Sequence, residues 1–156
     1  MAVSKDEFRQ GLSRFASGVT VVTCKGESGF MGMTVSAFSS LSLDPPLVLI
    51  CVHGRSSVHD ALQEGRSFAV NILAEDQEPI SRLFASKSAD RFSGVGYQEG
   101  KTGAPLIRGA LAFVECRITH SYPGGDHTIV VGQVEAVATR EGKPLLYFCG
   151  SYSHLG

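Results

Sequence analysis

Residues 114–136 read VECRITHSYPGGDHTIVVGQVEA and give the clearest indication of the fold class. Apolar side chains alternate with polar ones at Val114, Cys116 and Ile118, and the alternation resumes at Val130 beyond the turn. A period of two is that of a strand with one buried face. The central Tyr-Pro-Gly-Gly-Asp cluster supplies the residues of a tight reversal. The segment therefore predicts one long antiparallel hairpin.

Further strands are predicted upstream and downstream of this hairpin. Runs of β-branched and apolar residues are separated there by turns rich in glycine and proline. Asp44-Pro45-Pro46 interrupts the pattern, because proline has no N–H to donate to a neighbouring strand. The expected strands are residues 19–24 and 30–38 as a second hairpin, 47–52 as a buried central strand, 68–73, and 145–148 as the strand that closes the sheet, with residues 150–156 as a tail.

Helices are expected between these strands. Phe8, Leu12 and Phe15 recur at steps of four and three, which places them on one face of a helix that Gly18 ends. Apolar residues at similar spacing, preceded by a capping serine or an early proline, predict two more helices. The three expected helices are residues 6–17, a helix that starts at Ser56 or Ser57, and one that starts at Asp76.

The order of these elements favours one class of fold. Six or more strands joined mostly by hairpins, with scattered helices, indicate a mainly β protein with an antiparallel barrel, not a doubly wound sheet. The sequence contains no Gly-x-Gly-x-x-Gly, so the dinucleotide fingerprint of the doubly wound class is missing. A length of 156 residues suits a single domain, residues 1–156.

Charge and composition argue against several kinds of partner. The formal net charge is −1, and acidic and basic residues are mixed along the chain. This pattern lacks the basic excess that is typical of proteins that bind nucleic acid or anionic membranes. The apolar run Leu47–Val52 falls far short of the roughly 20 residues of a membrane span. No apolar leader follows Met1, so we expect a cytoplasmic protein with reduced cysteines. The four cysteines lack the paired spacing of a metal site, and none is expected.

Small hydroxyl residues interrupt an otherwise apolar strand at residues 32–40, which read GMTVSAFSS. Hydroxyls and backbone groups at a barrel edge can bond the carbonyls and ring nitrogens of a planar ligand such as a flavin. Val35 and Ala37 would then pack on the face of that ligand. A serine- and threonine-rich edge strand without a ligand explains this segment about equally well.

Arg55, Ser56 and Ser57 place one cation and two hydroxyls at the start of an expected helix. Exposed N–H groups and the helix dipole favour an anion there, so a phosphate fits. Ordinary N-capping explains the two serines as well.

His127 follows the Gly124-Gly125-Asp126 turn, so its imidazole is expected beside the turn and outside the core. Such a histidine can hydrogen-bond a nicotinamide or a flavin edge. The alternative is that His127 is an exposed hairpin histidine with no functional role. The other four histidines make weaker candidates, and His59 is expected on the solvent face of its helix.

Asp90-Arg91-Phe92 lies in an irregular stretch, residues 85–103, where a loop can carry function or simply pack on the surface. The sequence has no Gly-x-Ser-x-Gly, His-Glu-x-x-His or closely paired carboxylates, so hydrolase and metalloprotease functions gain little support.

These segments together resemble the flavin reductase-like family, which includes the short-chain reductase components of two-component flavin-dependent monooxygenases. The resemblance runs from about Phe8 to Tyr152. Its ordered motifs are residues 15–23 (FASGVTVVT), 34–48 (TVSAFSSLSLDPPLV), 90–95 (DRFSGV) and 124–132 (GGDHTIVVG). Several motifs in order are far more specific than any one of them.

The resemblance implies a split β-barrel that binds FMN or FAD, takes a hydride from NADH or NADPH, and forms a homodimer with each flavin near the subunit interface. It also implies that reduced flavin passes to a separate monooxygenase. The residues implied are Thr34, Val35, Ser36, Ala37 and Ser40 at the isoalloxazine and ribityl chain, Cys51, Val52 and His53 along the next strand, Arg55, Ser56 and Ser57 at the phosphate, Arg91 among the cofactor-binding residues, and His127 at the nicotinamide.

The flavin itself performs the hydride chemistry in such an enzyme, so little acid–base machinery is expected. The competing prediction is a flavin-binding or electron-transfer protein of the same barrel type without rapid NAD(P)H oxidation. Likeness of fold cannot separate the two, because function belongs to the site. The choices of FMN or FAD, and of NADH or NADPH, stay open at this point.

Overall fold

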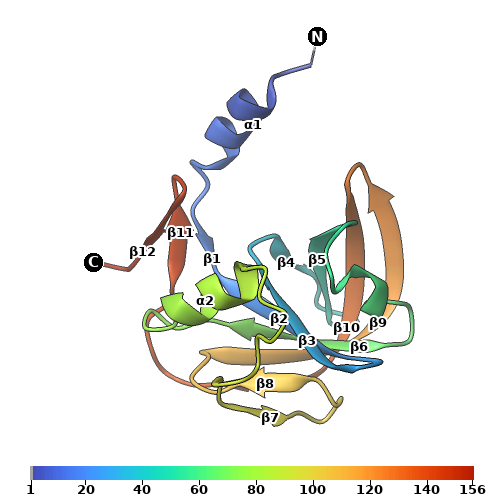
Figure 1. Cartoon of the computed structure of the whole chain (residues 1–156). Coiled ribbons are helices and arrows are strands. Elements are labelled where there is room, and N and C mark those ends of the chain that lie inside the picture. The colour runs from blue at the N-terminus through green and yellow to red at the C-terminus, as the bar shows by residue number, and fades with distance from the viewer. Residues whose placement is uncertain (1) are drawn as a thin grey trace.

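A computed structural model describes residues 2–156 and is dominated by strands (Figure 1). The order of elements begins with the helix α1 (Lys5–Leu12), and the second helix, α2, follows the first half of the strands. The full set is α1 (Lys5–Leu12), β1 (Ser17–Gly18), β2 (Thr20–Gly26), β3 (Gly29–Val35), β4 (Phe38–Ser42), β5 (Leu47–His53), the 3-10 helix η1 (His59–Ala61), β6 (Ser67–Ile72), α2 (Glu78–Ala85), β7 (Tyr97–Glu99), β8 (Pro105–Ile107), β9 (Ala112–Gly124), β10 (His127–Thr139), β11 (Leu146–Phe148) and β12 (Ser151–Ser153).

Seven strands form one antiparallel sheet in the order β3-β2-β6-β9-β10-β5-β4. The predicted long hairpin is confirmed as β9 and β10, which pair from the Gly124/His127 end to the Ala112/Thr139 end. The predicted hairpin of residues 19–24 and 30–38 is confirmed as β2 and β3, except that β3 ends at Val35 and Phe38 begins β4. All pairs of neighbouring strands in this sheet are antiparallel, as the hairpin-rich sequence predicts.

The sheet curves around its main core. Val22 and Val35 come from one end of the strand order and Val52 and Val130 from the other, yet all four belong to one buried cluster with Phe68. Strands that are far apart in a flat sheet can share a core only if the sheet coils upon itself. The result is the expected barrel, left open between its edge strands.

A second core lies under α2. Phe84 from this helix packs with Val21, Leu73, Ile107 and Leu145, which come from strands and loops around the β2 side of the barrel. The helix begins with Glu78 and carries its proline in the first turn, where a missing N–H costs nothing. This helix was predicted from Asp76 onward, and it is confirmed.

Two strands lie elsewhere than predicted. β5 is second from the edge of the sheet, not central, because β4 pairs along its outer side. β11 does not close the main sheet, because it pairs with β1 and β12 in a separate three-stranded sheet. The expected tail therefore contains a strand of its own.

Two predicted helices also differ. α1 ends at Leu12, and Phe8, Leu12 and Phe15 are 58%, 57% and 81% exposed, so the helix projects from the barrel (Figure 1). The helix predicted from Ser56 is only the three-residue η1. Ser56 Oγ accepts the N–H of Val58 at 3.3 Å, a local turn that competes with helical pairing.

No helix within residues 2–156 is both long enough and apolar enough to cross a bilayer.

Candidate functional site

Three of the predicted site segments meet at one end of the barrel. In the ladder of β5 and β10, His53 lies opposite His127, and Cys51 lies opposite Ile129. The N–H of Cys51 donates to the carbonyl of Ala37 at 3.0 Å, just before β4 begins. One edge at this end of the barrel therefore contains the hydroxyl-rich segment, the end of β5 and the start of β10.

A carboxylate between two imidazoles is the main charged feature of this edge. Asp126 Oδ1 lies 2.7 Å from His127 Nδ1, and Asp126 Oδ2 lies 3.9 Å from His53 Nε2. The two imidazole rings meet edge to face, with centroids 5.1 Å apart. The hydrogen bond from His127 lowers the pKa of the Asp126 carboxyl, so the carboxylate stays ionised at neutral pH.

This arrangement orients the imidazole of His127. A carboxylate only accepts, so His127 Nδ1 carries the proton and donates it to Asp126. In the neutral ring, Nε2 is then the free acceptor. Because the pKa of Asp126 is lowered, the carboxylate is ionised and its contact with His127 is present at every pH above the usual carboxyl pKa. The contact is lost only as the pH falls through the lowered pKa.

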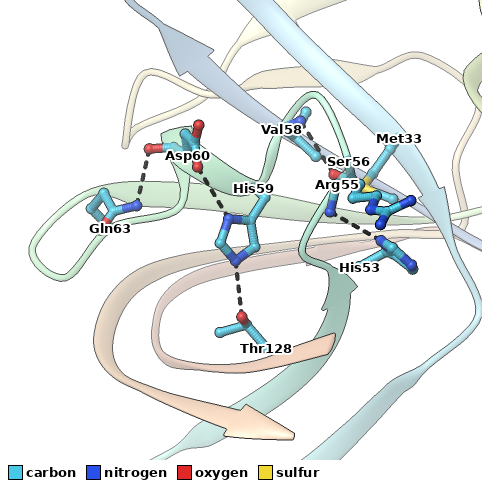
Figure 2. A network of polar contacts seen from close by, with 9 residues as sticks. All are labelled: Met33, His53, Arg55, Ser56, Val58, His59, Asp60, Gln63 and Thr128. Atoms are coloured by element: carbon cyan, nitrogen blue, oxygen red, sulfur yellow. Dashed lines mark hydrogen bonds and ion pairs between the residues drawn. The ribbon is translucent and has the colours of Figure 1, made fainter. Parts of the chain in front are cut away.

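The loop after β5 is bonded to the same cluster, and Figure 2 shows its contact between Arg55 and His53. Gly54 N–H donates to the carbonyl of Asp126 at 3.0 Å, and Arg55 N–H donates to His53 Nδ1 at 3.0 Å. With Nδ1 accepting, the proton of neutral His53 sits on Nε2, the nitrogen that faces Asp126. The loop is thus held in place while the side chain of Arg55 remains exposed.

The loop also contacts β3 and β10 (Figure 2). Ser56 Oγ lies 3.2 Å from Met33 Sδ. His59 Nε2 lies 2.9 Å from Thr128 Oγ1, and His59 Nδ1 lies 3.2 Å from Asp60. His59 was expected on a solvent face, and this expectation is wrong. Its side chain contacts Thr128, the residue next to His127, and so links η1 to β10.

Arg91 lies over β3, beside the loop. Its guanidinium donates to the carbonyl of Gly32 at 2.6 Å and to the carbonyl of Ser86, while its Nε is buried without a partner among the described residues. A cleft of about 260 Å³ brings Arg91 together with Ser57 and Lys87. An unpaired buried donor beside a hydroxyl and a second cation suits an anionic ligand group.

Several predicted residues have side chains that are already buried or hydrogen-bonded within the chain. The side chains of Val35 and Val52 are buried in the main core, so the expectation that Val35 packs on a ligand face is wrong. Thr34 Oγ1 is occupied, because it donates to the carbonyl of Ser81 at 2.6 Å. Ser36 and Ala37 are exposed at the edge, and Ser40 is exposed further along β4, opposite Val48.

Sequence reasoning missed three members of this site. Asp126 was noted as a turn residue, although its place next to His127 was a usable signal. His59 and Thr128 are 69 residues apart, and their contact depends on the register of β5 against β10, which local patterns do not show.

Comparison with known proteins agrees with this geometry. Residues 12–156 match the family model described as flavin reductase like domain. The reductase component of 4-hydroxyphenylacetate 3-monooxygenase from Thermus thermophilus is 44% identical over 97% of this chain and 97% of its own. An NADH-dependent flavin reductase from Rhodococcus is 43% identical over 94% of this chain and 84% of its own.

Solved structures agree as well. The NADH:FAD oxidoreductase of Streptomyces globisporus, in complex with NAD and FAD fragments, has a TM-score of 0.94 and 39% identity over 100% of this chain and 97% of its own. The curved antiparallel sheet with a polar site at its edge is thus the split barrel of the flavin reductases. The chain belongs to the flavin reductase like domain family.

Proposed function

We propose that the chain is an NADH:flavin oxidoreductase that reduces FMN or FAD and supplies reduced flavin to a separate monooxygenase. The observation that carries this proposal is the likeness, over the whole chain, to an NADH:FAD oxidoreductase solved with fragments of both of its ligands. Relatives named as reductase components of monooxygenases support the partner. The proposal makes the chain an oxidoreductase that acts on NADH with a flavin as acceptor.

The flavin is assigned to the edge formed by the end of β3, the start of β4 and the end of β5. Ser36 and Ala37 are exposed at this edge, and the hydroxyl of Ser36 can bond polar atoms of a ring system. Ser40 extends the same edge, and Cys51 and His53 border it from β5. Bound flavin supplies the hydride-accepting chemistry, so these residues need only bind and orient.

The flavin phosphate is assigned to the loop after β5 and to the neighbouring cleft. Arg55, Ser56 and Ser57 offer one cation and two hydroxyls, and Arg91 adds a buried N–H that has no partner in residues 2–156. Charge-assisted hydrogen bonds of this kind are the strong ones in phosphate sites. The loop is already fixed by its bonds to His53 and Asp126, so little order must be gained on binding.

The nicotinamide is assigned to the side where His127 emerges. Asp126 holds the imidazole with Nε2 free, and that atom can accept an N–H from the carboxamide. His127 is therefore a positioning group that brings the nicotinamide near the flavin edge, and rate enhancement comes mainly from that placement.

A homodimer in the cytoplasm completes the proposal. The apolar face of α1 is exposed in the single chain, and a second copy would cover it. All four cysteines are free thiols, which suits a reducing compartment.

Anaerobic mixing of the purified protein with FMN or FAD and an excess of NADH tests the activity. We expect the flavin absorbance to bleach at a rate proportional to protein concentration, while a control without protein bleaches slowly. Flavin that binds, as judged by quenched fluorescence, but bleaches no faster than the control would instead indicate a flavin-binding or electron-transfer protein.

A further inference from the structure

A second cavity, of about 300 Å³, lies at the opposite end of the β9–β10 hairpin from His127. It is bounded by the chain that leaves β8, by the start of β9 and by the end of β10. Ala138, in its wall, lies eleven residues beyond His127 on β10. That separation is roughly 35 Å along a strand, so the cavity is distinct from the proposed flavin site.

The cavity combines an apolar floor with a cationic rim. Leu106, Leu111, Phe113 and Ala138 line it with apolar surface, and Leu106 is only 6% exposed. Two arginines, Arg108 and Arg140, also line it.

The two guanidinium groups lack an acidic partner. Arg140 donates to the carbonyl of Glu141 at 2.9 Å and to the carbonyl of Gly109, and both of these acceptors are neutral. Within residues 2–156, the ion pairs of the protein involve neither Arg108 nor Arg140. Arg140 has five N–H donors and uses only part of them. The rim therefore carries two positive charges with free donors.

The walls of the cavity are fixed before any ligand arrives. Gln77 Nε2 donates to the carbonyl of Arg108 at 2.9 Å, and Gln77 Oε1 accepts the N–H of Ala74. The N–H of Leu111 donates to Ile72 at 2.7 Å, and the N–H of Arg140 donates to Leu111 at 2.9 Å. A site held by such bonds costs little conformational entropy on binding.

We propose that this cavity binds a small carboxylate that carries an aromatic ring or a short apolar chain. The carboxylate would pair with Arg108 and Arg140, since guanidinium groups bind carboxylates through paired hydrogen bonds. The apolar part would lie on Leu106 and Phe113. The volume is at the lower end of the range for small-molecule sites, which fits a one-ring ligand. The proposal does not depend on the flavin chemistry.

Titration of isotope-labelled protein with phenylacetate, followed by amide NMR shifts, tests the proposal. We expect saturable shifts at Leu111, Ala138 and Thr139, with no matching shifts at Gly54 and Thr128. We expect 2-phenylethanol, the uncharged analogue, and acetate, which lacks the ring, to bind at least tenfold more weakly than phenylacetate.

Arg108→Gln should weaken phenylacetate binding about tenfold, the loss of one charge-assisted pair. Arg9→Gln on α1 is the matched control, because it removes one exposed positive charge far from the cavity and should leave the affinity unchanged. The spectrum of each variant without ligand reports whether it is folded. Absence of saturable shifts, shifts centred on Gly54 and Thr128, or equal affinity in a folded Arg108→Gln variant would overturn the proposal.

Discussion

His127 and Asp126 act as a pair at the residue scale. The imidazole is held by a 2.7 Å contact to Asp126, and its remaining nitrogen is directed away from that carboxylate. The cross-strand neighbour His53 approaches the other carboxylate oxygen at 3.9 Å. If this pair positions the nicotinamide, its loss should weaken the binding of NADH and leave the binding of the flavin phosphate unchanged.

His127→Ala should raise the KM for NADH about tenfold, the cost of one lost polar contact to the ligand. The KM for FMN should change little, because the phosphate is assigned to the loop after β5. Steady-state kinetics with each substrate varied in turn measure both values. His120→Ala, which removes an exposed histidine of the same hairpin, is the control and should leave both values unchanged. An unchanged KM and kcat for NADH in His127→Ala would remove this role.

Arg55 is the exposed cation of the phosphate loop, and its side chain can be replaced without disturbing the core. Arg55→Gln should raise the KM for FMN several-fold, because one charge-assisted contact to the phosphate is lost. Riboflavin has no phosphate, so its KM should be the same in the variant and the parent protein. An equal rise for both flavins would show that Arg55 acts on the ring or on the fold instead of on the phosphate.

At the scale of elements, β10 carries both the site and a tight packing point. A Cβ added at Gly132 would lie 2.8 Å from Cys116 Cβ and 2.8 Å from the ring of Phe68. Both neighbours are completely buried, so neither can move freely.

Gly132→Ala should therefore lower the free energy of unfolding by about 1–3 kcal/mol through overpacking. Urea denaturation of both proteins measures this difference. Gly18→Ala is the matched control, because no atom lies within 4 Å of the added Cβ there and the effect should be small. Equal midpoints for Gly132→Ala and the parent protein would contradict the tight contact.

Local patterns predicted those elements whose partners are close in the sequence. The β9–β10 hairpin followed from alternation on both sides of one turn, and α2 followed from its spacing and early proline. One partner of β11 is β1, which lies more than a hundred residues earlier, and no local signal indicates that pairing. The helix expected from Ser56 does not form. The Ser56 hydroxyl and the contacts of this loop with β3 and β10 stabilise a turn there instead.

The same distinction applies to the site. His127 and the Arg55-Ser56-Ser57 loop were predicted because each stands beside a recognisable turn or element end. The burial of Val35 and Val52 and the hydrogen bond of Thr34 to α2 depend on how the sheet curves, so the sequence could not show that these side chains are already engaged within the chain.

At the scale of the whole molecule, one chain leaves apolar surface exposed. α1 has no buried residue, and Phe8 and Leu12 on it are more than half exposed. A protein that acts as a monomer rarely leaves a contiguous apolar face exposed. The expected homodimer provides a cover for it.

Light scattering should therefore give a mass of about 33 kDa, twice the 16.6 kDa of one chain. Replacement of both Phe8 and Leu12 by Glu should shift the mass toward about 17 kDa, because charged side chains would oppose burial of that face. A parent protein of about 17 kDa would refute the dimer, and a variant that stays dimeric would place the interface elsewhere.

Flavin reductase activity is measured by steady-state oxidation of NADH by the purified protein in air, with FMN, FAD or riboflavin added in turn and a control without flavin. We expect NADH to disappear rapidly, at a rate that saturates as the flavin concentration rises and that falls to background without flavin. Tight flavin binding with no NADH or NADPH oxidation above background would show that the protein is not a flavin reductase.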